Sequence, residues 1–145
     1  MGITFNHLTL SIRDLARSTS FYRDIVGLHL EADWDRGAYL TAGATWICLS
    51  LDPNTRSGPF PEYTHIAFGC EAAEFETRAA RIRRSGAPVW KENSSEGDSL
   101  YFLDPDGHKL ELRSGDLQTR LTACRTRPYD GMKFYTEPAP QETLG

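Results

Sequence analysis

The chain has 145 residues, of which 39% are hydrophobic and 25% are charged, and its formal net charge is −4. This length fits one domain with a single core, and the composition is that of a soluble globular protein. The acidic balance argues against nucleic acid as the main partner, because phosphate binding requires a basic face. No apolar run is long enough to span a membrane and the N-terminus lacks a secretory pattern, so a cytoplasmic location is expected.

The cysteines are few and far apart. Cys48, Cys70 and Cys124 form no CxxC pair, and their number is odd. A disulfide framework or a cysteine zinc site is therefore not expected, and all three are predicted to be buried free thiols.

The first half of the chain predicts a strand, a helix and three more strands. Residues 4–12 alternate between apolar and polar side chains, which is typical of a strand with one apolar face. Asp14 then occupies the N-cap position of a helix whose apolar residues recur at near-helical spacing until Gly27. The three later strands are predicted at about 28–34, 38–42 and 45–51.

The same order returns after a linker rich in proline and polar residues, at 52–62. Residues 63–69 predict a strand, and 72–85 predict a helix that Gly86 ends. Strands are predicted at about 88–92, 99–103 and 108–113, with a tight turn at Asp104-Pro-Asp-Gly107 before the last.

The repeated order indicates an internal duplication within an α+β fold. Aligning Asn6-His-Leu-Thr-Leu with Thr64-His-Ile-Ala-Phe places His65 on His7. We expect one domain at 1–135, with βαβββ modules at about 3–51 and 63–113. A C-terminal helix is predicted at about 116–125 behind an Asp cap, and 136–145 are expected to be a disordered tail.

Two histidines and a glutamate on separate strands are candidate metal ligands. His7, His65 and Glu111 have the composition of a facial triad, which leaves positions open for substrate on divalent Mn, Fe, Ni or Zn. Taken singly, each residue fits an ordinary half-exposed strand better than a ligand role, and the repeat of the histidine is what favours the metal. His29 and His108 have no counterpart and are expected at the surface.

The polar loop 93–99 is a second candidate site. Its hydroxyls, carboxylate and carbonyls offer oxygen ligands of the kind that hard cations such as K⁺ prefer, but composition alone favours a solvated hairpin loop. Lys91, Tyr101 and Arg120 would add a pocket for a phosphate or phosphonate, or else remain solvated surface groups. The aromatic residues Trp34, Tyr39, Trp46 and Trp90 are core residues by default.

Several reaction classes lose support because their motifs are missing. The chain has no glycine-rich phosphate loop before a helix, no GxSxG nucleophile elbow and no HExxH metal motif.

With these residues in view, the chain resembles the vicinal oxygen chelate (glyoxalase) superfamily. Within it, the chain is similar to the manganese-dependent glutathione transferases of the FosA type, which confer fosfomycin resistance. The resemblance covers residues 6 to about 134. The stretches that carry it are Asn6-His-Leu-Thr-Leu, Phe21-Tyr-Arg-Asp, Gly37-Ala-Tyr-Leu, Tyr63-Thr-His, Trp90-Lys, Asn93, Ser95-Glu-Gly-Asp-Ser, Tyr101-Phe-Leu-Asp-Pro-Asp-Gly-His, Leu110-Glu, Pro128-Tyr and Gly131-Met.

The resemblance implies a cupped mixed sheet in a homodimer whose subunits exchange modules. It also implies Mn²⁺ and K⁺ as cofactors, with fosfomycin and glutathione as substrates. The implied roles are Mn²⁺ binding by His7, His65 and Glu111; phosphonate binding by Thr9, Lys91, Ser95, Tyr101 and Arg120; K⁺ binding by Asn93, Ser95, Glu96, Gly97 and Ser99; and a substrate pocket lined by Trp46 and Tyr39.

The implied reaction is opening of the fosfomycin epoxide by a thiolate, with Thr9 near the epoxide oxygen and Tyr39 on the side from which the thiol approaches. Three alternatives stay open: a related epoxide hydrolase, a transferase that uses another thiol, and a non-enzymatic drug-binding protein. The hydrolase requires a carboxylate base, and residues 39–51 contain none. Ser94 and Arg36 depart from the family pattern, which bears on the thiol preference.

Overall fold

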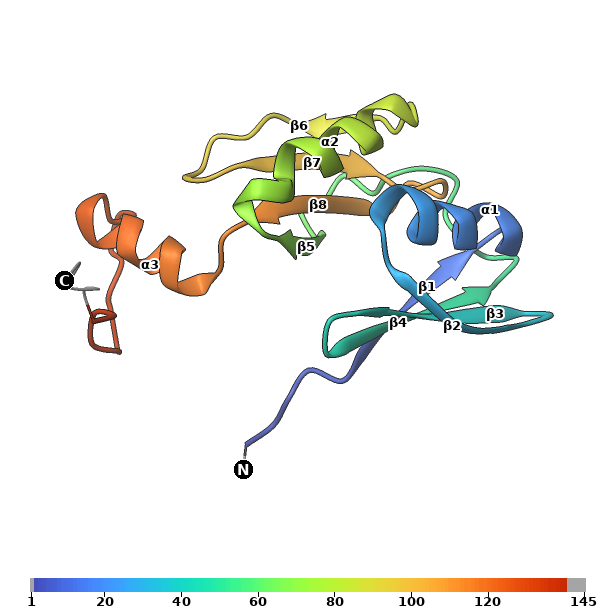
Figure 1. The fold of residues 1–145 in the computed structure, drawn as a ribbon, viewed down its shortest axis with the longest axis horizontal. Coiled ribbons are helices and arrows are strands. Elements are labelled where there is room, and N and C mark those ends of the chain that lie inside the picture. Colours follow the sequence, from blue (N-terminus) through green and yellow to red (C-terminus); the bar gives the residue numbers. More distant parts are fainter. Residues whose placement is uncertain (1, 141–145) are drawn as a thin grey trace.

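Strand, helix and three strands follow one another twice in the computed structural model, which describes residues 2–140 (Figure 1). The duplicated order predicted from the sequence is confirmed. The first copy comprises β1 (His7–Ile12), α1 (Leu15–Ser20), the π-helical segment η1 (Phe21–Val26), β2 (His29–Trp34), β3 (Gly37–Ala42) and β4 (Thr45–Leu51). The second comprises β5 (Ile66–Cys70), the 3₁₀ turn η2 (Ala72–Glu74), α2 (Phe75–Arg84), β6 (Val89–Lys91), β7 (Ser99–Leu103) and β8 (Lys109–Ser114), and α3 (Leu117–Thr126) comes last.

The helix ends follow from local chemistry that the sequence indicates. The Asp14 side chain accepts a hydrogen bond from the Arg17 backbone N–H and caps α1. Gly27 adopts φ +97° after η1, a conformation that favours glycine. Asp116 and Thr119 form a reciprocal capping box at the start of α3. These residues fix where α1 and α3 begin and where η1 ends.

Each module forms a mixed sheet of four strands with the same topology. The strand orders are β1-β4-β3-β2 and β5-β8-β7-β6, and the first pair of each sheet is parallel. Because side chains alternate between the faces of a strand, each sheet has one apolar and one more polar face. The predicted α+β class, with two βαβββ modules and mixed sheets, is confirmed.

The apolar faces form a common core with the helices. Residues such as Leu10, Leu49, Phe102 and Leu110 are almost fully buried in one hydrophobic cluster that spans both modules. α1 lies over the first sheet and α2 over the second (Figure 1). The polar faces of the two sheets therefore point away from this core, and they hold the candidate site residues.

A buried turn between β7 and β8 joins the modules. Asp104 is only 4% exposed; its carboxylate accepts a hydrogen bond from the Tyr22 hydroxyl of η1 (2.6 Å) and two from backbone N–H groups of its own turn. Asp106 pairs with Arg17 (3.2 Å), and His108 Nε2 donates to the Ser11 carbonyl (2.8 Å).

The expectation that His108 lies at the surface is wrong, because its turn docks against the first module and the ring is buried. His29 is exposed, as expected. Of the predicted thiols, Cys124 is buried, whereas Cys48 and Cys70 are only partly buried.

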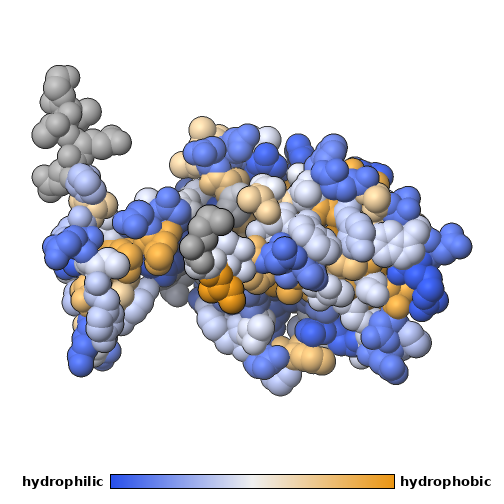
Figure 2. All heavy atoms as spheres, turned by 90° about the horizontal axis from the view of Figure 1, so that it is seen from below, coloured by the Kyte–Doolittle hydropathy of each residue, from blue (hydrophilic) through white to orange (hydrophobic). Residues whose placement is uncertain are grey.

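The C-terminal segment extends from the end of β8 beside the body (Figure 1), and Figure 2 shows it as a lobe. Residues 136–140 have no regular secondary structure, and the rest of the predicted tail, 141–145, lies outside the described residues. Within residues 2–140, no helix has the length and apolar character needed to cross a membrane.

The turn generates a prediction for stability. Tyr22→Phe removes a donor from a buried carboxylate, so it should lower the free energy of unfolding by about 1–3 kcal/mol. Urea denaturation at neutral pH measures this change. Tyr135→Phe, at a side chain that is 89% exposed, is the matched control and should change stability by less than about 0.5 kcal/mol.

The same pair of variants has an expected pH dependence. Burial, together with the nearby Asp104 carboxylate, raises the pKa of Tyr22 well above its ordinary value. A group with a raised folded pKa stabilises the fold below its unfolded pKa and loses that contribution as pH rises. The wild type should therefore lose its advantage over Tyr22→Phe above about pH 10. An advantage that stays constant from neutral to alkaline pH would contradict this account.

Candidate active site

The polar face of the second sheet carries a row of functional side chains. Tyr101 on β7 pairs in register with Glu111 on β8, and Lys91 on β6 pairs with Tyr101. His65 immediately precedes β5, whose Ala67 lies beside Glu111. The strand register thus brings together residues that are distant in the sequence.

His65 and Glu111 form a pair that suits a metal ion. The His65 Nδ1–H donates to the Tyr63 carbonyl (2.8 Å), which leaves Nε2 with a lone pair in the neutral ring. Nε2 lies 3.0 Å from Glu111 Oε1, and the second oxygen of this buried carboxylate accepts from the Ser99 hydroxyl (2.7 Å). Two hydrogen-bond acceptors that face each other require a shared proton or a cation between them. The His65 nitrogen and the Glu111 carboxylate therefore fit a divalent metal ion as ligands.

His7 lies on the polar face of the other sheet. Its ring stacks on Trp46 with centroids 4.1 Å apart, and its Nδ1 contacts the Asn6 side chain (2.6 Å). Trp46 in turn meets Tyr39 edge to face (5.0 Å), and Thr9 is exposed on the same sheet face. Across residues 2–140 of a single chain, no three His, Cys, Asp or Glu side chains converge as a metal site. Within one chain, His65 and Glu111 therefore lie together, whereas His7 lies apart from them on the other sheet.

Cationic side chains surround the His65 and Glu111 pair in a hollow of about 740 Å³. Lys91 Nζ donates to the Tyr63 hydroxyl (2.9 Å), and this hydrogen bond raises the pKa of Lys91. Arg120 donates to the Tyr129 hydroxyl (3.0 Å), and this hydrogen bond raises the pKa of Arg120. Three cationic side chains, those of Lys91, Arg120 and Arg127, beside several hydroxyl groups make this hollow suitable for an anion. Its polar lining comprises Tyr63, His65, Lys91, Ser94, Ser95, Glu96, Tyr101, Glu111, Arg120, Arg127 and Tyr129.

The predicted potassium loop is closed by internal hydrogen bonds. Asn93 donates to the Gly97 carbonyl (2.8 Å), and its side-chain oxygen accepts from Ser95. Gly97 has φ +75°, which lets the loop turn tightly. Arg113 on β8 donates to the Glu96 carbonyl and also pairs with the Glu96 carboxylate, which Arg120 contacts as well (2.9 Å).

The sequence-predicted site residues thus fall into two groups. No site role is expected from the sequence for Tyr63, Arg113 or Tyr129, although Tyr63-Thr-His and Pro128-Tyr are among the stretches that carry the family resemblance. The first sheet carries His7, Thr9, Tyr39 and Trp46. The hollow in the second module brings together His65, Lys91, Ser95, Glu96, Tyr101, Glu111 and Arg120, with Asn93, Gly97 and Ser99 in or beside its loop.

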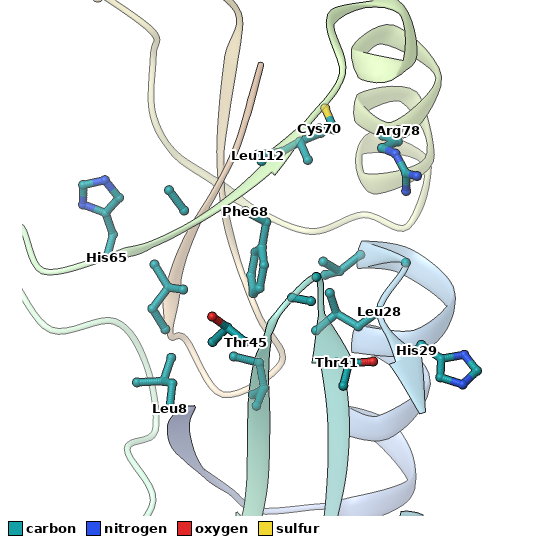
Figure 3. Close-up of a pocket in the computed structure, with 18 of the residues that line it drawn as sticks. Leu8, Leu28, His29, Thr41, Thr45, His65, Phe68, Cys70, Arg78 and Leu112 are labelled. Carbon is teal, nitrogen blue, oxygen red and sulfur yellow. The ribbon is translucent and has the colours of Figure 1, made fainter. Parts of the chain in front are cut away.

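A larger hollow of about 920 Å³ lies between the modules and is mostly apolar (Figure 3). Leu8, Phe68 and Leu112 line it, and His65 lies at its edge with the ring turned away from the apolar centre. Size alone therefore does not mark the reactive site, because the polar and titratable groups gather in the smaller hollow.

Comparison with known proteins gives the family. The family model of the Glyoxalase/Bleomycin resistance protein/Dioxygenase superfamily matches residues 4–112 of this chain. The chain is 49% identical over 138 residues to the glutathione transferase FosA of Serratia marcescens, covering 94% of this chain and 98% of that protein. This chain is a Fos protein of the glyoxalase superfamily. It is also 34% identical to the metallothiol transferase FosB of Staphylococcus saprophyticus, over 91% of this chain and 89% of the relative.

Solved structures of Fos proteins share the fold. A mutant of FosX from Listeria monocytogenes, complexed with Mn(II) and 1S,2S-dihydroxypropylphosphonic acid, has a TM-score of 0.74 at 29% identity, covering 85% of this chain and 98% of that one. FosX from Mesorhizobium loti has a TM-score of 0.65 at 28% identity, covering 83% of this chain and 97% of that one. The Fos assignment therefore rests on both sequence and structure.

The Ser99 hydroxyl offers a test of metal binding by the His65 and Glu111 pair. Ser99→Ala removes a donor that orients Glu111, and loss of such a supporting contact should weaken Mn²⁺ binding roughly tenfold. Titration of the protein with Mn²⁺, followed by the electron paramagnetic resonance of the free ion, measures the affinity. Ser57→Ala, at an exposed serine in the linker, is the control. Equal affinities for the two variants would exclude a supporting role for Ser99.

Proposed function

We propose that this protein transfers glutathione to fosfomycin and thereby opens its epoxide ring. The observation that carries the proposal is the hollow in which the His65 and Glu111 pair adjoins Lys91, Tyr101 and Arg120. A metal-binding pair beside cationic groups suits a substrate that joins a phosphonate to an epoxide. The 49% identity to the glutathione transferase FosA of Serratia marcescens supports glutathione as the thiol.

We further propose that two copies of the chain complete each metal site. His7 from one subunit would join His65 and Glu111 of the other and hold Mn²⁺ in a module-exchanged homodimer. The exposed position of His7 on its sheet supports this arrangement, as does the exposure of apolar groups near both ends of the chain, including Phe5, Leu117 and Tyr129.

The chain's own residues would bind and orient the substrate. Lys91 and Arg120, with the hydroxyls of Ser95 and Tyr101, would hold the phosphonate dianion by charge-assisted hydrogen bonds. Thr9, from the sheet that carries His7, would donate a hydrogen bond to the epoxide oxygen. The bound cation would supply Lewis acidity at that oxygen.

Ring opening then exchanges one bond for another. The thiolate sulfur forms a bond to a ring carbon while that carbon's bond to oxygen breaks, and the oxygen finally takes up a proton. Trp46 and Tyr39 would line the approach of the thiol and limit the access of water. The loop with Asn93, Glu96 and Ser99 would add a second positive charge beside the phosphonate, from a potassium ion or from a side chain.

An epoxide hydrolase is the second candidate, because the FosX structures share the fold and one of them contains a dihydroxypropylphosphonic acid. Against it, residues 39–51 of this chain provide no carboxylate to activate water. Transfer of a different thiol is the third candidate, supported by the FosB relatives.

Turnover with different nucleophiles separates these candidates. Purified protein with Mn²⁺ should consume fosfomycin in the presence of glutathione and form a glutathione adduct that mass spectrometry detects. Rates with cysteine, or with water alone, should be lower by about tenfold or more, because the thiol site selects its substrate through specific contacts. Formation of the diol without thiol would establish a hydrolase, and no turnover by metal-loaded protein would leave only drug binding.

Subunit complementation tests the shared metal site. His7→Ala and Glu111→Ala should each be inactive as homodimers, since each lacks one ligand. In a mixed dimer, both lesions fall in one site and the other site is intact. Coexpression of the two variants should therefore restore up to about a quarter of wild-type activity, because half of randomly assembled dimers are mixed and each has one intact site of two. Coexpression of His65→Ala with Glu111→Ala is the control and should restore nothing.

A further inference from the structure

We propose that Arg113 supplies the positive charge of the polar loop in place of a potassium ion, so that the activity of this protein does not depend on K⁺. The inference rests on the proposed transfer of glutathione to fosfomycin, because it identifies the second charge beside the phosphonate.

The guanidinium of Arg113 lies among the oxygens predicted to bind K⁺. Its Nη1 donates to the Glu96 carbonyl (3.0 Å) and to the Ser99 hydroxyl (3.3 Å), and Nη2 pairs with the Glu96 carboxylate. The side chain is only 12% exposed, so it is fixed by packing as well as by hydrogen bonds. A guanidinium is always charged in proteins. The loop therefore already contains a fixed cation.

The other predicted ligands are also engaged. The Gly97 carbonyl accepts from Asn93 (2.8 Å), and the Asn93 side-chain oxygen accepts from the backbone and hydroxyl of Ser95. A potassium ion would have to displace these donors and approach the Arg113 charge at the same two oxygens. Since like charges at such distances repel strongly, the loop as arranged here does not fit K⁺.

The position of Arg113 also explains how it would act on the site without touching the substrate. Glu96 lies between two guanidinium groups, those of Arg113 and Arg120. By pairing with Glu96, Arg113 offsets the carboxylate that would otherwise neutralise Arg120. Arg113 also supports the His65 and Glu111 pair through Ser99, whose hydroxyl accepts a hydrogen bond from Arg113 and donates one to Glu111. Arg113 is thus a positioning residue for both the phosphonate and the metal.

The test measures turnover of fosfomycin while KCl replaces tetramethylammonium chloride, from zero to about 100 mM at constant ionic strength so that screening does not change. The turnover rate of the wild type should change by less than about twofold across this range of KCl. Arg113→Gln should lose roughly tenfold without K⁺, the size expected when one fixed charge is removed from a site, and should regain most of the loss with K⁺. Arg113→Lys retains the charge and should stay insensitive. Arg84→Ala, at an exposed arginine of α2, should behave as wild type.

A binding measurement without substrate makes the result independent of turnover. Thallium(I) replaces potassium in protein sites, and its nuclear magnetic resonance reports binding directly. Wild-type protein should not bind it, and Arg113→Gln should. Binding by the wild type, activation of the wild type by K⁺, or a folded Arg113→Gln variant that remains insensitive to K⁺ would each overturn the proposal. If the wild type consumes no fosfomycin in any salt, the proposed function fails, whereas the thallium result still decides the role of Arg113.

Discussion

A carboxylate buried between the two modules determines how the rest of the molecule is arranged. Asp104 is removed from water, and its charge is tolerable only because the Tyr22 hydroxyl and two backbone N–H groups donate to it. Tyr22 belongs to the first module and Asp104 to the second. The hydrogen bond from the Tyr22 hydroxyl therefore links the two modules, and the apolar faces of both sheets close over a common core.

With the apolar faces joined, the polar faces of a single chain point outward. His65 and Glu111 meet on one of them, whereas His7 lies on the other against Trp46. The three side chains of a facial triad all bind the same ion directly, so residues separated in this way serve one metal only if another copy brings the missing histidine. In the proposed dimer, each chain would thus contribute two half sites.

The sequence predicts the elements well because their causes are local. Alternation of side chains, the Asp14 and Asp116 caps and the left-handed Gly27 each act within a few residues. The pairing of His65 with Glu111 is also predictable, since the repeat marks the histidine. The burial of His108 is not, because a Pro, Asp and Gly turn is normally exposed and only its contact with the first module removes it from water. The role of Arg113 depends on where a loop folds back over β8, which no local pattern specifies.

The hydrogen bonds of Arg113 have an evolutionary consequence. A charge carried on a side chain is inherited and constant, whereas a charge drawn from solution follows the salt content of the cell. One codon, at position 113, would separate these two designs, since the surrounding oxygens of Glu96 and Ser99 can serve either cation. Under the proposed role of Arg113, a single substitution would thus convert activity that is independent of potassium into activity that depends on it.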